Sequence, residues 1–312
     1  MIASIPPNME GTRALSQYGI VVCDVCNTSD WHWDGDENLR CLTCHTRLPI
    51  EGKVLDCLSR PARSTSTIEQ WNVRYEEEAS KLYSERKDWW TLSSWKRHLF
   101  RSVLPDLRGK FVLDIGCGTA VRVATLAPID AWGYTYVGID SSLEALKAAA
   151  GNIPGGVFIL ANLDALRLRP ASADVVLCLG VLMYFADSAK LLDKILNVLK
   201  PGGVLLLHEQ VSRRRWGQIA QGAFPLRRER HSDAWGVPRN DLQAALRPRG
   251  RVLHAHGAGS PWRKLFMNAL DNSSLERLRP TVAWFDSAWC ATIGRILPDV
   301  GASEVHLVFR KN

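Results

Sequence analysis

The sequence lacks any apolar run close to the ~20 residues that a membrane-spanning helix requires. Its first residues, Met1–Asn8, also lack the basic segment and the apolar segment of a secretory signal. From these two absences we expect a cytoplasmic protein that does not contact membranes. The 312 residues, 46% of them hydrophobic and 23% charged, are typical of a globular protein with one large domain, or with an ordinary domain and a small appendage.

The missing signal also argues against a disulfide framework, although the chain contains eight cysteines. Four of them form two Cys-x2-Cys pairs, Cys23/Cys26 and Cys41/Cys44, which are separated by fourteen residues. Each pair places two thiolates on one tight turn, and two such turns can close a tetrahedral zinc site. Because four sulfur ligands leave no open coordination position, the spacing predicts a structural zinc ion rather than a catalytic one.

The complete glycine fingerprint of a dinucleotide-binding fold is also missing. An apolar run, Phe111–Ile115, leads into Gly116-Cys117-Gly118, but the third glycine would fall at Val121 and is absent. A run of this kind predicts a strand that is buried on both faces of a parallel sheet. The glycines that follow allow the backbone N–H groups of the turn to approach a ligand closely.

Further strand, helix and turn signals follow in a regular order. We predict strands over Thr135–Asp140, Val157–Leu160, Asp174–Leu179, Val204–Leu207, Arg251–His256 and Glu304–Phe309, and helices over Leu143–Ala150 and Ser188–Leu199. The segment Lys200-Pro201-Gly202-Gly203 predicts a turn that feeds the strand at Val204. The joint order of glycine turn, acid, buried strands and Pro-Gly-Gly turn over Phe111–Glu209 resembles the class I S-adenosylmethionine-dependent methyltransferases.

This resemblance implies a Rossmann-like α/β fold, with a seven-stranded, mostly parallel sheet and helices on both faces. It also implies S-adenosylmethionine as the cofactor. An acid at the end of the second strand, Asp140, is placed to accept hydrogen bonds from the ribose hydroxyls. Asn162 stands where the family usually has an aspartate beside the adenine, and its carbonyl can accept the same hydrogen bond. The full implied cofactor set is Asp114, Gly116, Cys117, Gly118, Asp140, Ser141, Asn162, Leu163 and Leu179.

A second resemblance covers the amino-terminal cysteines. Residues Val21–Leu58 resemble the small zinc-ribbon activator subunit of tRNA and translation-factor methyltransferases. We therefore expect a zinc-ribbon domain over 1–59 and a linker with cofactor-covering helices over 60–105. A methyltransferase domain over 106–312 would follow, with a substrate lid inserted at about 211–300. Trp71 and Tyr75 in the expected helices either line the site or pack in the core.

Three further residues are candidates for the chemical step. Ligands of open α/β sheets bind beyond the carboxyl ends of the strands, where His208, Glu209 and Tyr184 are expected. His208 is the candidate general base because an imidazole titrates near neutral pH, and a purely structural role at the strand end is the alternative. Glu209 would share the base role or bind a substrate hydroxyl or amine. Tyr184 would orient the substrate or pack beneath the cofactor.

The formal charge of +7 is unevenly distributed. Between Pro201 and Leu270 twelve Arg or Lys residues stand against four acidic ones, which suits an anionic small molecule or RNA, or a solvated basic surface. The segment after Leu179 lacks the Asn-Pro-Pro-Tyr motif of amino methylation. We expect methyl transfer to oxygen or nitrogen of a natural-product or glycan-type metabolite. The alternatives are a tRNA or rRNA methyltransferase and a non-catalytic partner subunit that binds the cofactor.

Overall fold

The computed structural model describes residues 19–34, 38–58, 106–126, 133–185, 187–210, 239–258 and 304–312, together with 278, 281, 284–285, 288–289 and 292. The helices expected within 60–105, with Trp71 and Tyr75, and most of the expected lid lie outside these residues. The chain forms two compact units. The first consists of Met1–Glu85, Asp106–Val176 and Asn197–Lys200, and the second of Arg86–Pro105, Leu177–Leu196 and Pro201–Asn312.

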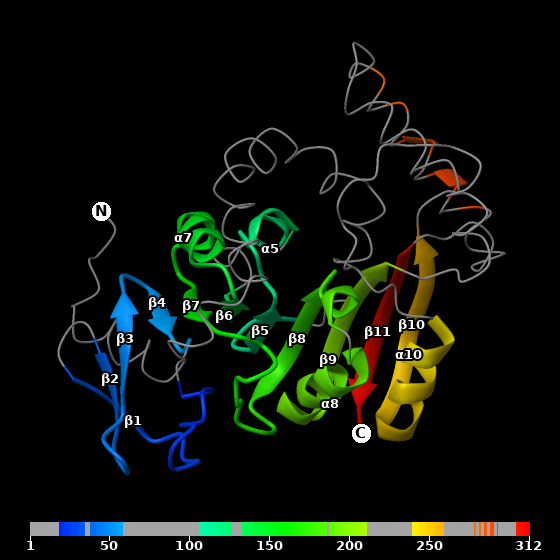
Figure 1. Cartoon of the computed structure of the whole chain (residues 1–312). Coiled ribbons are helices and arrows are strands. Elements are labelled where there is room, and N and C mark those ends of the chain that lie inside the picture. Colours follow the sequence, from blue (N-terminus) through cyan, green and yellow to red (C-terminus); the bar gives the residue numbers. More distant parts are fainter. Residues whose placement is uncertain are drawn as a thin grey trace, which may run out of the picture. The chain divides into compact units, whose positions relative to one another are not determined.

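The first unit is built on the parallel strands β5 (Phe111–Ile115), β6 (Thr135–Asp140) and β7 (Val157–Leu160) (Figure 1). Strand β6 pairs in parallel with both β5 and β7. Every residue of β7, and all but the first residue of β5 and β6, is buried, as in strands that are covered on both faces. Helices α5 (Val121–Leu126) and α7 (Leu143–Asn152) follow β5 and β6.

The second unit contains the end of β8 and three later strands, of which the last in the chain is antiparallel to its neighbours. Strand β8 (Ala173–Leu179) begins in the first unit and ends in the second. It is followed by the 3-10 helix η2 (Leu182–Tyr184), α8 (Ser188–Val198), β9 (Leu199–Gln210), α10 (Arg239–Leu246), the 3-10 helix η3 (Arg247–Arg249), β10 (Gly250–Ala258) and β11 (Glu304–Lys311). Strand β11 pairs antiparallel with β9 and with β10.

The strand order is β7-β6-β5-β8 in the first unit and β8-β9-β11-β10 in the second. These are the strands expected from the sequence, and the predicted Rossmann-like, mostly parallel sheet is confirmed. Within the part of the chain that the structure describes, no helix is both long and apolar enough to cross a membrane.

Several boundaries differ from the sequence prediction, and two of them involve glycines. The predicted turn Lys200–Gly203 lies within β9, and Gly202 adopts a positive φ of 75° there, a conformation that glycine reaches without steric strain. Helix α7 continues through Gly151 to Asn152 instead of ending before the glycine. Its last turn is closed because the N–H of Ile153 donates to the carbonyl oxygen of Ala149.

The cysteine-rich segment adds four strands to the first unit: β1 (Trp31–Trp33), β2 (Asn38–Cys41), β3 (Arg47–Glu51) and β4 (Val54–Asp56). Neighbouring strands from β1 to β4 pair antiparallel, as expected for a ribbon. Strand β4 pairs in parallel with β7, with Val54 opposite Phe158. The ribbon therefore continues the parallel sheet beyond β7.

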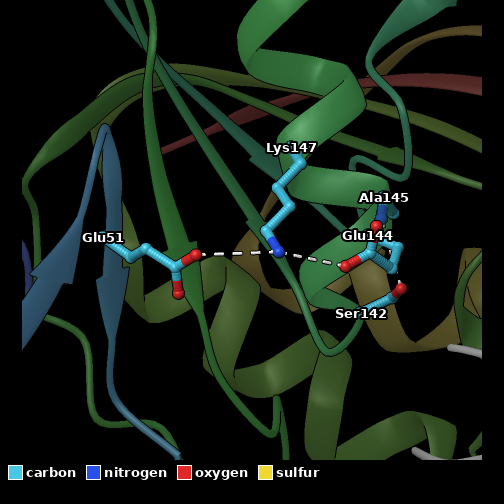
Figure 2. Close-up of polar contacts among 5 residues, drawn as sticks. All are labelled: Glu51, Ser142, Glu144, Ala145 and Lys147. Carbon is cyan, nitrogen blue, oxygen red and sulfur yellow. Dashed lines mark hydrogen bonds and ion pairs between the residues drawn. The ribbon is translucent and has the colours of Figure 1, made fainter.

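Backbone hydrogen bonds away from β4 hold the ribbon as well. Val22 donates its N–H to the carbonyl oxygen of Arg167 at 3.0 Å, and the N–H of Arg169 donates to Ile20 at 2.8 Å. Figure 2 shows Lys147 of α7 between Glu51 of β3, at 3.6 Å, and Glu144, at 3.1 Å. Exposed ion pairs of this kind add little stability, so the backbone pairing contributes most of the attachment.

Candidate functional site

The glycine turn after β5 is fixed to the end of β6. Gly116 and Gly118 have positive φ values of 65° and 54°, so the turn uses the conformational freedom that the sequence predicts. Cys117 donates its N–H to the carbonyl oxygen of Ile139 at 3.0 Å. The N–H of Gly118 donates to Oδ2 of Asp140 at 2.8 Å. The turn and the acid thus form one constellation.

The carboxylate of Asp140 is buried and held by backbone donors. Its Oδ2 accepts from Gly118, and its Oδ1 accepts from the N–H of Ser142 at 3.0 Å. Burial raises the pKa of Asp140, and the backbone N–H groups of Ser142, Gly118 and Ser141 oppose that rise. Each carboxylate oxygen can accept a second hydrogen bond, so the group retains capacity for a pair of ribose hydroxyls. Ser142 also caps α7 by accepting from Ala145 at 3.3 Å.

Asp114 lies one strand away from Asp140 and is also buried. Its Oδ2 accepts a hydrogen bond from the hydroxyl of Tyr136 at 2.7 Å. Burial raises the pKa of Asp114 to about 7, although the Tyr136 hydrogen bond and the charge of Arg122 act in the opposite direction. A carboxyl group of this kind changes charge near neutral pH, and a neighbouring ammonium group would favour its ionised form.

Gly138 of β6 leaves the space in which the turn packs. A Cβ at this position would lie 2.8 Å from Sγ of Cys117, 3.1 Å from the ring of Phe158 and 3.2 Å from the ring of Tyr136. These distances are shorter than ordinary van der Waals contacts, so an added methyl group would displace the turn or the aromatic rings. The glycine at 138 therefore serves close packing.

Replacing Gly138 with alanine is expected to destabilise the protein by about 1–3 kcal/mol, because overpacking a dense core forces its neighbours apart. Gly151 is the matched control, since a Cβ there meets no atom within 4 Å and the residue lies in α7. Gly151→Ala is expected to stabilise by about 0.5–1 kcal/mol. Urea unfolding of both variants measures the difference, and equal stabilities would contradict the packing role of Gly138.

The loop after β7 contains the predicted adenine-side residues. Oδ1 of Asn162 accepts the N–H of Asp164 at 3.0 Å, which forms a local turn. The main-chain carbonyl oxygen of Asn162 accepts the N–H groups of Ala165 and Leu166. Leu163 is buried in the same loop. The side-chain Oδ1 of Asn162, which is expected to meet the adenine amino group, thus already accepts one hydrogen bond, from Asp164. Its second lone pair remains for another donor.

In the second unit, Glu209 of β9 binds backbone instead of facing open space. The residue is fully buried, and its Oε1 accepts the N–H groups of Val181 and Leu182, each at 2.9 Å. Its Oε2 accepts the N–H of Met183 at 3.3 Å. Both carboxylate oxygens therefore hold the loop that follows β8. The geometry favours a positioning role for Glu209 over the predicted share in proton transfer.

His208 is buried in the second unit, and its ring stacks on that of His306 with centroids 4.3 Å apart and planes 13° apart. The two residues are cross-strand partners on β9 and β11. The carbonyl oxygen of His208 accepts the N–H of Gly180 at 2.6 Å. Tyr184, with 37% of its surface exposed, ends the loop, and Leu179 ends β8. His306 was not predicted, because only the strand register brings it to His208.

The four predicted metal ligands lie together in the ribbon. The Sγ atoms of Cys23, Cys26, Cys41 and Cys44 all lie within 4.8 Å of one another. The Sγ atoms of Cys23 and Cys44 are 3.5 Å apart, and those of Cys26 and Cys41 are 3.4 Å apart. Four thiols converging on one point fit a tetrahedral zinc ion, and the shell is closed by protein ligands alone.

Two threonines complete the cysteine turns. Thr28 Oγ1 lies 3.2 Å from Sγ of Cys26, and Thr46 Oγ1 lies 3.2 Å from Sγ of Cys44. The hydroxyl of Thr46 is the main reason that the pKa of Cys44 is lowered, which favours the thiolate that binds metal. Sequence reasoning missed both threonines, although the repeated pattern Cys-x-x-Cys-x-Thr in the two turns was a usable signal.

A methyltransferase domain family matches residues 113–207, which run from β5 into β9. The predicted resemblance to class I methyltransferases is thereby confirmed for this part of the chain, which is a methyltransferase domain. It is 28% identical over 182 residues to trans-aconitate 2-methyltransferase from Afipia carboxidovorans, covering 55% of this chain and 67% of that protein. It is 30% identical over 132 residues to tRNA U34 carboxymethyltransferase from Desulfotalea psychrophila, covering 39% of each chain. The chain spans between about a third and two thirds of the curated relatives it matches.

Two solved structures support the methyltransferase fold. One is a chain from the complex between the Haloferax volcanii Trm112 methyltransferase activator and a methyltransferase, with a TM-score of 0.50, 18% identity, and coverage of 78% of this chain and 97% of that one. The other is Haemonchus contortus phosphoethanolamine N-methyltransferase 2 in complex with S-adenosyl-L-methionine, with a TM-score of 0.53, 14% identity, and coverage of 80% and 61%. At these identities the similarity establishes the fold of the methyltransferase.

One unpredicted residue of the methyltransferase fits a bound cofactor. Thr119 follows the glycine turn, and its Oγ1 is buried without a hydrogen-bond partner among the residues that the structure describes. A buried hydroxyl without a partner is unfavourable, and a polar ligand at the turn would satisfy it. Thr119, the backbone of the turn and the two acids together form a polar cradle suited to an amino acid and a ribose.

Proposed function

We propose that this methyltransferase transfers a methyl group from S-adenosylmethionine to oxygen or nitrogen of a small molecule. The observation that carries the proposal is the fixed carboxylate of Asp140, which is anchored by Gly118 and Ser142 and keeps acceptor capacity for two hydroxyls. In this assignment Asp140 accepts the ribose hydroxyls, and Asp114 holds the amino group of the methionine end. Asn162 and Leu163 would contact the adenine.

S-adenosylmethionine supplies an activated methyl group when bound, so the protein has to align a nucleophile and remove its proton. The substrate lone pair forms the new bond to the methyl carbon while the carbon–sulfur bond breaks. We assign the acceptance of the substrate proton to His208. Glu209 holds the Val181–Met183 segment, and Tyr184 at the end of η2 would orient the substrate.

We further propose that the Cys23, Cys26, Cys41 and Cys44 cluster binds one structural zinc ion. The closed set of four sulfur ligands supports a structural role. The ribbon over 1–59 would act as a built-in extension of the methyltransferase domain at 106–312, because β4 continues the sheet at β7. The segment 60–105 would cover the cofactor, and the lid at about 211–300 would select the substrate.

An RNA substrate is the second candidate. The cluster of arginines between Pro201 and Leu270 favours it, and one relative is named for a tRNA nucleotide. The same arginines would bind a carboxylate or phosphate on a small molecule, and another relative is named for trans-aconitate, an acid. The missing Asn-Pro-Pro-Tyr motif favours the small molecule. A non-catalytic subunit that only binds the cofactor is the third alternative.

The test is a methyl-transfer screen with methyl-labelled S-adenosylmethionine against pools of small carboxylic acids, phenols, amines and phosphorylated metabolites, with total tRNA and rRNA in parallel. We expect label in a small-molecule pool. Label only in RNA would support the second candidate. No label in any pool, with the cofactor bound, would support the third.

His208→Asn is expected to lower turnover about 10²–10⁴-fold, the range associated with a positioned general base. The affinity for the cofactor is expected to remain unchanged, because the residues assigned to the methionine and ribose lie in the other unit. His254→Asn, at an exposed position on β10, is the control and should retain full turnover. If His208→Asn turned over at the rate of the control, the base assignment would be wrong.

A further inference from the structure

A buried tyrosine contacts one of the two acids assigned to the cofactor. The side chains of Tyr136 and Asp114 are 0% and 3% exposed, and the phenol donates to Oδ2 of Asp114 at 2.7 Å. No role has so far been given to Tyr136, which the sequence places within an ordinary buried strand. A polar hydroxyl in this position needs a partner, and a phenylalanine would fill the same apolar space.

The sheet register explains how the two side chains meet. Strands β5 and β6 are parallel neighbours, with Val112 opposite Tyr136 and Asp114 opposite Gly138. Residues two apart on a strand share a face, so Tyr136 and Asp114 are diagonal neighbours on one face. Because Gly138 has no side chain, the space opposite Asp114 is open to the Tyr136 ring and to Sγ of Cys117.

We propose that Tyr136 is a positioning residue of the cofactor site, which fixes the Asp114 carboxylate in its ionised form for the amino group of S-adenosylmethionine. This inference rests on the proposed function. The hydrogen bond occupies one oxygen of Asp114 and leaves the other to face the ligand. A phenol donor favours the carboxylate over the carboxylic acid, because its hydrogen bond to the charged group is the stronger one.

The groups that face Asp114 give the proposal a distinctive pH dependence. From β6, Tyr136 donates to it and the charge of Asp140 opposes its ionisation, and from α5, Arg122 favours ionisation. Cys117 in the turn and Tyr134, directly before β6, are held neutral, since burial and the nearby Asp charges raise the pKa of both. Without the Tyr136 donor, the pKa of Asp114 would rise from about 7 to a higher value.

The test compares the affinity of the full-length protein for S-adenosylhomocysteine, a non-reactive probe, with that of Tyr136→Phe at pH 6 to 9 by calorimetry. The ratio of the two Kd values at each pH cancels the titration of the ligand's own amino group. We expect the variant to bind roughly tenfold more weakly at pH 6, a factor that corresponds to a pKa rise of about one unit. At pH 9 Asp114 is ionised in both proteins, and the ratio should approach one.

Tyr134→Phe is the matched control, because it removes a second buried phenol, which lies directly before β6 and whose ring is edge-on to that of Tyr136 with centroids 6.5 Å apart. Its Kd ratio should stay within about twofold of one at every pH. A Tyr136→Phe ratio that is constant over the pH range, or that equals one throughout, would overturn the positioning role. A wild-type protein that binds no ligand at any pH would instead contradict the proposed function.

Discussion

Substituting Cys41 with serine is expected to reduce zinc from one ion per chain to none and to unfold the ribbon. Cys41 is fully buried, and its Sγ is one of the four that converge within 4.8 Å. Ribbons of this size have few buried apolar side chains, and zinc binding to such peptides supplies about 10–16 kcal/mol at neutral pH. Losing one ligand therefore removes the main source of folding free energy.

The structure of the turns gives a physical reason for the expected dependence of the ribbon on metal. Each turn is closed by the same backbone hydrogen bond. The N–H of Cys23 donates to the main-chain carbonyl oxygen of Thr28 at 2.7 Å, and the N–H of Cys41 donates to that of Thr46 at 2.8 Å. Asn27 and His45, which follow the second cysteine of each turn, have positive φ values of 62° and 63° that non-glycine residues adopt only at a cost. Metal coordination would offset this strain and the crowding of four thiolates.

Metal analysis and amide hydrogen exchange measure the effect of Cys41→Ser. Amides in β1, β2 and β3 should lose protection, and β4 should lose its pairing with β7. Cys57→Ser is the control, because Cys57 lies outside the cluster of four cysteines. This variant should still bind one zinc ion per chain. A metal-free protein whose ribbon amides remain as protected as those of the wild type would show that zinc is not a structural component.

Replacing Glu209 with alanine is expected to destabilise the protein by about 3–5 kcal/mol. The substitution leaves the N–H groups of Val181, Leu182 and Met183 without their acceptor, and each unsatisfied buried donor costs about 1–3 kcal/mol. The loop after β8 should then lose its fixed conformation, and Tyr184 with it. Turnover is expected to fall together with stability.

Urea unfolding and exchange of the three loop amides measure this change. Glu209→Gln retains a carbonyl oxygen as an acceptor, but its amide N–H groups would point toward backbone donors. We therefore expect its stability to lie between that of the wild type and that of the alanine variant. An alanine variant within about 0.5 kcal/mol of the wild type would mean that the loop does not depend on Glu209.

The central strands and the glycine turn could be predicted because local sequence determines them. The buried apolar runs of β6 and β7 match the predicted bounds, and Asp140 lies where an acid after the second strand was expected. The clustering of the four cysteines proposed to bind zinc was equally accessible to prediction, because their spacing alone brings two thiolates onto each turn.

The partners of the charged residues could not be predicted, because contacts between distant segments determine them. Sequence position suggests proton transfer for Glu209, but its carboxylate meets backbone N–H groups about thirty residues earlier in the chain. The stacking of His208 on His306 depends on the register of β9 and β11. In the sequence, Tyr136 is one more residue of a predicted buried strand. Its contact with Asp114 depends on the pairing with the neighbouring strand, which places the carboxylate beside its hydroxyl.

The most direct test of the account is calorimetric titration of the intact protein with S-adenosylmethionine at pH 8, where Asp114 is ionised. We predict saturable binding at one site per chain with a micromolar Kd, about −8 kcal/mol. The polar cradle of Asp114, Asp140 and the glycine turn would then be the cofactor site. Absence of saturable binding up to millimolar concentrations of the cofactor, with protein that is folded and zinc-loaded, would contradict the methyltransferase assignment of function.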